Sequence, residues 1–135
     1  MLIACDFDGT VTTRDCLHLI VQGFAPEAWA EIEPRLRTRE IGLLQAIEEE
    51  FSHVRITEED AVRHVLAGTE IRPGFPEFVE WVEGAGHQLV IVSAGFRVLI
   101  DPVLSAAGLS RLRVFSGDAR FSLQGTTIRY PRSLR

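Results

Sequence analysis

Two aspartates set two residues apart are the side chains of this sequence best suited to chemistry. Asp6 and Asp8 follow the short apolar run Leu2–Cys5, which predicts a β-strand, and Gly9 then ends the regular backbone. We therefore expect the pair at the carboxyl end of a strand, where open α/β sheets bind their ligands. If the pleat of the strand continues, both carboxylates point to the same side.

Such a pair suits phosphoryl transfer. Asp6 can attack phosphorus and become an aspartyl-phosphate, and Asp8 can protonate the leaving oxygen and then activate a water molecule. Because carboxylates and phosphates repel each other, a cation must lie between them, and Mg²⁺ prefers oxygen ligands of this kind. A polar turn with Asp8-Gly9 as its turn residues could have the same sequence, so the motif alone leaves that alternative open.

A second chemical stretch follows the strand predicted over Gln88–Val92. Ser93-Ala94-Gly95-Phe96 is expected to be a loop of small residues that opens a helix over 96–107. The free N–H groups of a helix N-terminus, together with the Ser93 hydroxyl, would form a phosphate cradle. An ordinary strand-to-helix connection capped by Ser93 is the alternative. Pro102 predicts a kink in this helix or a later start.

Residues 13–69 read as a block of helices. Thr13 is expected to cap the first of them and Thr57 the last. Pro34 is expected to kink or split the second helix, because proline removes a backbone hydrogen bond. Asp15 falls in the first turn of the first helix, where it either stabilises the helix terminus or faces the aspartate pair and touches a substrate.

The remaining segments complete an α/β pattern. An amphipathic helix should carry four apolar residues: Phe78, Val79, Trp81 and Val82. A third strand should span 112–115, and residues 120–130 should form a hairpin. Asp118 is interpreted as a turn residue, since no Asp or Glu follows it.

Composition indicates a soluble globular domain. The 135 residues are 46% hydrophobic and 24% charged, and no run is long enough to span a bilayer. The N-terminus has no basic segment before an apolar one, so we expect a cytoplasmic protein. A net charge of −5 without a basic stripe argues against nucleic acid and membranes as partners. Cys5 and Cys16 lack metal-ligand spacing and are expected to be reduced, packed thiols.

The motifs, taken in order, resemble a known family. Residues 6–11, 71–75 and 90–96 are similar to the signatures of the phosphoserine-phosphatase-like branch, subfamily IB, of the haloacid dehalogenase (HAD) superfamily. Within that branch, residues 24–29 and Asp15 are most similar to the methionine-salvage phosphatases of 2-hydroxy-3-keto-5-methylthiopentenyl-1-phosphate. The resemblance implies an α/β fold with a Rossmann-like core, formed by residues 1–12 and 70–135, an inserted helical cap over 13–69 and a β-hairpin near the C-terminus.

The resemblance also implies a function and a set of site residues. The function is Mg²⁺-dependent hydrolysis of a small phosphorylated metabolite through an aspartyl-phosphate. Asp6 would be the nucleophile and Asp8 the general acid/base, with the Asp6 carboxylate and the Asp8 carbonyl as magnesium ligands. Five residues would hold phosphate and a sixth the substrate: Gly9, Thr10, Ser93, Ala94 and Gly95, and then Asp15. Arg39 and Arg55 are candidates for a substrate-binding arginine in the cap.

The sequence departs from the family pattern in its third and fourth motifs. The chain contains no lysine, and only Arg132 or Arg135 could mimic the third motif; the acidic fourth motif has no counterpart. We therefore expect an incomplete core whose activity is weak or absent unless another segment completes it. In this core Leu2–Cys5 would be an exposed sheet edge, open to homodimerisation. The alternative function is a non-catalytic fragment that binds phosphate or a partner. The substrate stays open among phosphoserine, the methionine-salvage enol phosphate and phosphorylated amino alcohols.

Overall fold

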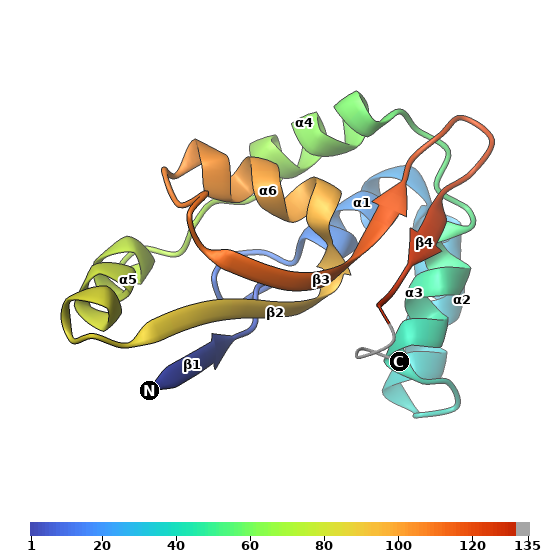
Figure 1. The fold of residues 1–135 in the computed structure, drawn as a ribbon. Coiled ribbons are helices and arrows are strands. Elements are labelled where there is room, and N and C mark those ends of the chain that lie inside the picture. The colour runs from blue at the N-terminus through green and yellow to red at the C-terminus, as the bar shows by residue number, and fades with distance from the viewer. Residues whose placement is uncertain (132–135) are drawn as a thin grey trace.

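The computed structural model describes residues 1–131 and has an α/β architecture built on one four-stranded sheet (Figure 1). Its strands run in the order β1-β2-β3-β4, where β1 is Leu2–Cys5, β2 is Gln88–Phe96, β3 is Arg113–Arg120 and β4 is Thr127–Arg129. The first three strands are parallel, and β4 pairs antiparallel with β3. The predicted fold class is therefore confirmed, including the C-terminal hairpin.

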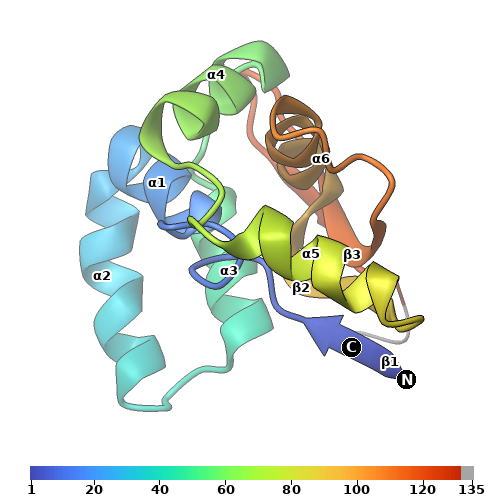
Figure 2. The same cartoon turned by 90° about the vertical axis from the view of Figure 1, so that its left-hand side faces the viewer.

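Six helices lie among the described residues, and the first five separate β1 from the rest of the sheet along the chain. They are α1 (Cys16–Phe24), α2 (Pro26–Arg37), α3 (Leu43–Phe51), α4 (Glu58–Gly68), α5 (Phe75–Gly84) and α6 (Arg97–Ala106). Figure 2 shows α1, α2 and α3 grouped beyond one end of the strands. None of the helices in this part of the chain has the length and apolar character needed to cross a bilayer.

The two faces of the sheet differ in how well they are covered. Leu89, Ile91 and Val114 point to the face against which α5 and α6 pack, and all three are buried. On the opposite face Val92 and Phe115 remain 37% and 46% exposed. Since β1 has a neighbour on one side only, it is a sheet edge among residues 1–131, as expected.

The helix termini follow capping chemistry, with one change from the prediction. Thr57 caps α4, where its hydroxyl accepts the amide hydrogen of Asp60 at 3.2 Å. The cap of α1 is Asp15 rather than Thr13, because the Asp15 carboxylate accepts from the amides of Leu17 and His18. The prediction for Thr13 was wrong, since its amide instead donates to the Glu70 carbonyl at 3.0 Å.

A split of the second helix at Pro34 and a later start of the helix that contains Pro102 do not occur, while the alternative of a kink at each proline stays a prediction. Pro34 lies inside the continuous helix α2, and Pro102 lies inside α6, which begins at Arg97. Pro34 is exposed, as is Ala30, whose carbonyl loses the helical hydrogen bond and faces water instead. The helix α5 forms as predicted, but Phe78 and Trp81 lie on its outer face, 41% and 63% exposed.

The end of β2 differs most from the prediction. Ser93–Phe96 is not a loop but the last part of the strand, and its pairing with β3 is irregular: Ser93 pairs with Ser116, and Phe96 pairs with Gly117. The backbone at Ala94 and Gly95 therefore bulges out of the ladder. Asp118 is a residue of β3 rather than of a turn, and the hairpin pairs Asp118–Arg120, not Arg120–Leu123, with β4.

Candidate active site

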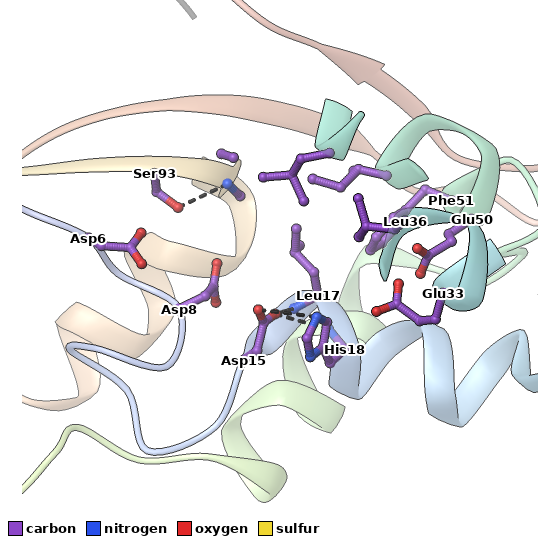
Figure 3. A pocket seen from close by; sticks show the side chains of 14 residues that line it. Asp6, Asp8, Asp15, Leu17, His18, Glu33, Leu36, Glu50, Phe51 and Ser93 are labelled. Carbon is purple, nitrogen blue, oxygen red and sulfur yellow. Dashed lines mark hydrogen bonds and ion pairs between the residues drawn. The ribbon is translucent and has the colours of Figure 1, made fainter. Parts of the chain in front are cut away.

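The predicted chemical residues meet at one pocket of about 130 Å³, where the carboxyl ends of β1 and β2 face α1, α2 and α3 (Figure 3). Six of the proposed site residues line it: Asp6, Asp8, Asp15, Ser93, Ala94 and Gly95. Figure 3 shows the carboxylates of Asp6, Asp8 and Asp15 directed toward the same space. Gly9 and Thr10 lie outside this lining, in the loop that follows Asp8.

The loop after β1 is held by its own backbone. The carbonyl of Phe7 accepts from the amides of Thr10, Val11 and Thr12 at 3.1, 2.9 and 3.2 Å. Gly9 has a φ of 75°, a left-handed conformation that glycine adopts without strain. The hydroxyl of Thr10 donates to Asp6 at 3.5 Å. These contacts fix the directions in which the side chains of Asp6 and Asp8 point.

Arg72 ties the same loop to the start of α5, a role that sequence reasoning missed. Its guanidinium donates to the carbonyls of Gly9 and Thr10, at 2.9 Å each, and more weakly to Thr12 at 3.4 Å. Its amide donates to the Val11 carbonyl at 2.7 Å. The planar guanidinium of Arg72 can donate to several carbonyls at once, and the single ammonium group of a lysine could not reproduce this geometry.

Asp8 occupies a more enclosed position than Asp6. Its carboxylate accepts the amide hydrogen of Cys16, the first residue of α1, at 2.9 Å. Burial, followed by the nearby charges of Asp15 and Asp6, raises the pKa of Asp8 to about 6 against the stabilising Cys16 amide. Cys5 and Cys16 are both free thiols, as predicted, and burial raises the pKa of Cys16 far above its usual range.

Asp15 combines the two interpretations that the sequence left open. One carboxylate oxygen caps α1, and the other lies 3.5 Å from the ring nitrogen Nε2 of His18. The His18 ring packs edge-on against Trp29 of α2, with centroids 4.7 Å apart. The cap of the helix is thus also an acidic group in the pocket wall, and its position is fixed by the fold.

The end of β2 presents a hydroxyl and an amide side by side. Ser93 is buried, and its Oγ accepts the amide hydrogen of Gly95 at 2.9 Å. A Cβ at position 95 would lie 2.7 Å from Asp8 Oδ2 and 3.1 Å from Ser93 Oγ, so any larger residue here would displace the Asp8 carboxylate. The bulged backbone therefore brings Asp8 into close contact with the Ser93–Gly95 segment.

The far wall of the pocket carries a pair of glutamates, of which Glu50 belongs to an acidic run, Glu48–Glu50, that is typical of a solvated helix face. Glu50 of α3 is only 5% exposed and faces Glu33 of α2 (Figure 3). Burial, then a hydrogen bond and charge repulsion from Glu33, raise the pKa of Glu50 to about 8. Around the pair lie the apolar side chains of Leu17, Leu36, Leu43, Ile47 and Phe51.

No arginine is among the residues that line this pocket within 1–131. Arg39 and Arg55 were the candidates for a substrate-binding arginine. Arg55 lines a different surface depression, and Arg39 lines neither that depression nor this pocket. Arg132 and Arg135 lie outside the described residues. The described part of the site is therefore acidic and apolar, with His18 as its one nitrogen-bearing side chain.

The oxygen atoms of Asp6 and Asp8 are possible ligands for a divalent cation. Residues 1–131 hold no cluster of three or more His, Cys, Asp or Glu side chains placed to bind a metal ion. However, Asp6 and Asp8 offer hard oxygen donors in the same pocket. Mg²⁺ needs only one or two protein carboxylates when water and a phosphate complete its shell, so this donor chemistry fits it.

Comparison with known proteins places the chain in a family. The profile of haloacid dehalogenase-like hydrolases matches residues 3–131. This chain belongs to the haloacid dehalogenase-like hydrolases. Among similar hydrolases of known structure, an aspartyl-phosphate intermediate analogue of phosphoserine phosphatase has a TM-score of 0.74 at 17% identity and covers 95% of this chain. A HAD family hydrolase from Salmonella enterica has a TM-score of 0.78, also at 17% identity, and covers 96% of the chain but 45% of its own length.

The curated relatives of this HAD hydrolase are phosphatases. A 2-hydroxy-3-keto-5-methylthiopentenyl-1-phosphate phosphatase of Brevibacillus brevis is 29% identical over 132 residues, or 97% of this chain and 60% of that protein. The bifunctional enzyme MtnB/MtnX of Bacillus licheniformis is 33% identical over 96% of this chain and 30% of its own length. The chain thus spans less than two thirds of the relatives that it matches.

Proposed function

We propose that this chain carries the catalytic centre of a magnesium-dependent phosphomonoester hydrolase that works through an aspartyl-phosphate on Asp6. The observation that carries the proposal is the meeting of Asp6, Asp8 and the Ser93–Gly95 segment at one pocket. Asp8 and Ser93, at the ends of the two strands, are 85 positions apart in the chain. Together these groups would supply a nucleophile, a proton donor and acceptor, and a phosphate-binding segment.

In the first step an Asp6 carboxylate oxygen attacks phosphorus, and the bond from phosphorus to the ester oxygen breaks. The departing oxygen takes a proton from Asp8, so the alcohol leaves neutral. In the second step water attacks the phosphorus of the aspartyl-phosphate and gives its proton back to Asp8. Inorganic phosphate leaves, and both aspartates return to their starting states.

The other residues bind and orient. Ser93 Oγ and the amides of Ala94 and Gly95 would donate to the phosphate oxygens, and the Asp6 carboxylate and Asp8 carbonyl would hold Mg²⁺. The chemistry that the ion supplies when bound is neutralisation of charge between the carboxylates and the phosphate. The Arg72 fork keeps the Asp6–Thr12 loop in place through the Gly9 and Thr10 carbonyls.

The wall of the pocket favours one class of substrate. Asp15 and Glu33 would repel a carboxylate, whereas Leu36, Ile47 and Phe51 offer an apolar surface. We therefore place a small phosphomonoester with an apolar remainder, such as the methylthio group of the relatives' substrate, ahead of phosphoserine. Phosphorylated amino alcohols are compatible with the acidic side chains.

The test is release of inorganic phosphate from a generic aryl phosphate with and without Mg²⁺. We expect turnover that requires Mg²⁺ and is lost in Asp6→Asn. The matched control is Asp60→Asn on α4, an exposed aspartate whose one side-chain partner within residues 1–131 is Arg63. Turnover that persists in Asp6→Asn at the level of Asp60→Asn would refute the proposal.

A second candidate, a phosphate- or partner-binding module without turnover, is favoured by the uncovered sheet face. Leu2, Val92 and Phe115 are 63%, 37% and 46% exposed, and β1 is an open edge. Under this candidate the protein dimerises with increasing concentration, and Phe115→Glu weakens the dimer. A strictly monomeric protein in sedimentation equilibrium would exclude this homodimer.

A further inference from the structure

Tyr130, just after β4, lies against the phosphate-binding segment from the side opposite the pocket. Its hydroxyl donates to the Ala94 carbonyl at 2.8 Å, across 36 positions of sequence. The side chain is only 8% exposed. Sequence analysis gave Tyr130 no role beyond ending the hairpin.

The hydrogen bond from Tyr130 sets the orientation of the peptide between Ala94 and Gly95. The described chain has no cis peptide bond, so the Ala94 carbonyl and the Gly95 N–H point in opposite directions within the plane of their shared peptide. Because Tyr130 holds the carbonyl on one side, the amide hydrogen is turned to the other side, toward Ser93 Oγ at 2.9 Å. That side is the pocket that Asp8 also lines.

Two features of β3 support Tyr130 in this position. A Cβ on Gly117 would lie 2.5 Å from the Tyr130 ring, so the absence of a side chain there makes room for the ring. Next to it, Asp118 Oδ1 accepts the amide hydrogen of Val98, in the first turn of α6, at 3.1 Å. The hairpin thus holds the segment from Ala94 to Val98 at both ends.

We propose that Tyr130 is a positioning residue for phosphate binding, whose hydroxyl fixes the Ala94–Gly95 peptide so that the Gly95 amide faces the pocket beside Ser93. The proposal rests on the proposed function in that the ligand is a phosphate group. Burial, and then the charge of Glu48, raise the pKa of Tyr130 to about 12, so its hydroxyl stays protonated and remains a donor at neutral pH.

The test compares Tyr130→Phe with Thr126→Val. Thr126 lies on the same hairpin and its hydroxyl also donates to a carbonyl at 2.8 Å, but to Val54, away from the pocket. Both variants lose one hydroxyl-to-carbonyl hydrogen bond and keep the size of the side chain. Two readouts are used: hydrogen exchange of the Gly95 amide by NMR, and the dissociation constant of inorganic phosphate with Mg²⁺.

Tyr130→Phe is expected to speed exchange at Gly95 and to weaken phosphate binding, each by about three- to tenfold, the size of one hydrogen bond. Thr126→Val is expected to change neither. The proposal is overturned if Tyr130→Phe leaves both readouts unchanged, or if Thr126→Val changes them equally. If the unmodified protein does not bind phosphate, the proposed function fails, while the exchange comparison still decides whether Tyr130 fixes the Gly95 amide.

Discussion

Replacing Glu50 with glutamine should make the stability of the protein less dependent on pH. The pKa of Glu50 is raised, so the folded chain keeps a proton that the unfolded chain releases between pH 4.5 and about 8. Protonated Glu50 therefore stabilises the fold fully below pH 4.5, and this contribution is lost as the pH rises through about 8. Glu50→Gln keeps the shape of the side chain and a hydrogen-bond donor toward Glu33, but it cannot ionise.

The size of the effect follows from the pKa. A carboxyl pKa raised from 4.5 to about 8 corresponds to at most about 5 kcal/mol, at about 1.4 kcal/mol per pH unit. Within that limit, we expect the unmodified protein to lose about 2–4 kcal/mol more than Glu50→Gln between pH 5 and pH 9.

Urea unfolding followed by tryptophan fluorescence at pH 5, 7 and 9 measures this difference. Glu48→Gln is the control, since Glu48 lies on the same helix but is exposed. The expected result is that Glu50→Gln gains stability relative to the unmodified protein as the pH rises, whereas Glu48→Gln follows the unmodified protein. Parallel stability curves for Glu50→Gln and the unmodified protein would refute the reasoning.

Two further substitutions probe the site itself. Gly95→Ala places a Cβ 2.7 Å from Asp8 Oδ2, so we expect kcat/KM to fall by at least about tenfold. Gly42→Ala, which meets no atom within 4 Å, is its control, and equal kinetics in the two variants would contradict the close contact. Arg72→Ala removes the fork that holds the Gly9 and Thr10 carbonyls and should lower the free energy of unfolding by about 1–3 kcal/mol. Arg63→Ala breaks only the exposed ion pair with Asp60 and should lower the free energy of unfolding, measured by urea titration, by less than about 1 kcal/mol. An equal loss in both variants would show that the hydrogen bonds of Arg72 to the loop do not stabilise the fold.

The local parts of this molecule could be predicted from the sequence. The strand before Asp6, the cap at Thr57 and the candidate chemistry of Asp6, Asp8 and Ser93 depend on neighbours in the chain, and their signals lie within a few residues. The element order then followed from hydrophobic periodicity and turn residues, which is why the α/β class was correct.

The residues that hold the site in place make contacts with distant parts of the chain, and no local sequence pattern predicts such contacts. Arg72 reaches a loop 62 positions earlier, Tyr130 reaches Ala94 across 36, and Asp118 reaches Val98 across 20. Glu50 belongs to an acidic run that is typical of a solvated helix face, and only the packing of α2 against α3 turns it toward Glu33. Ser93–Phe96 looked like a loop because its residues are small, yet pairing with β3 extends the strand through it.

The most direct test of the account is to trap the phosphoryl group on the enzyme. The protein would be mixed with an aryl phosphate and Mg²⁺, quenched in acid, and digested for mass spectrometry. The account predicts a phosphoryl group on the peptide that contains Asp6, removed by hydroxylamine and absent in Asp6→Asn. Turnover with the phosphoryl group on Ser93, or turnover unchanged in Asp6→Asn, would contradict it.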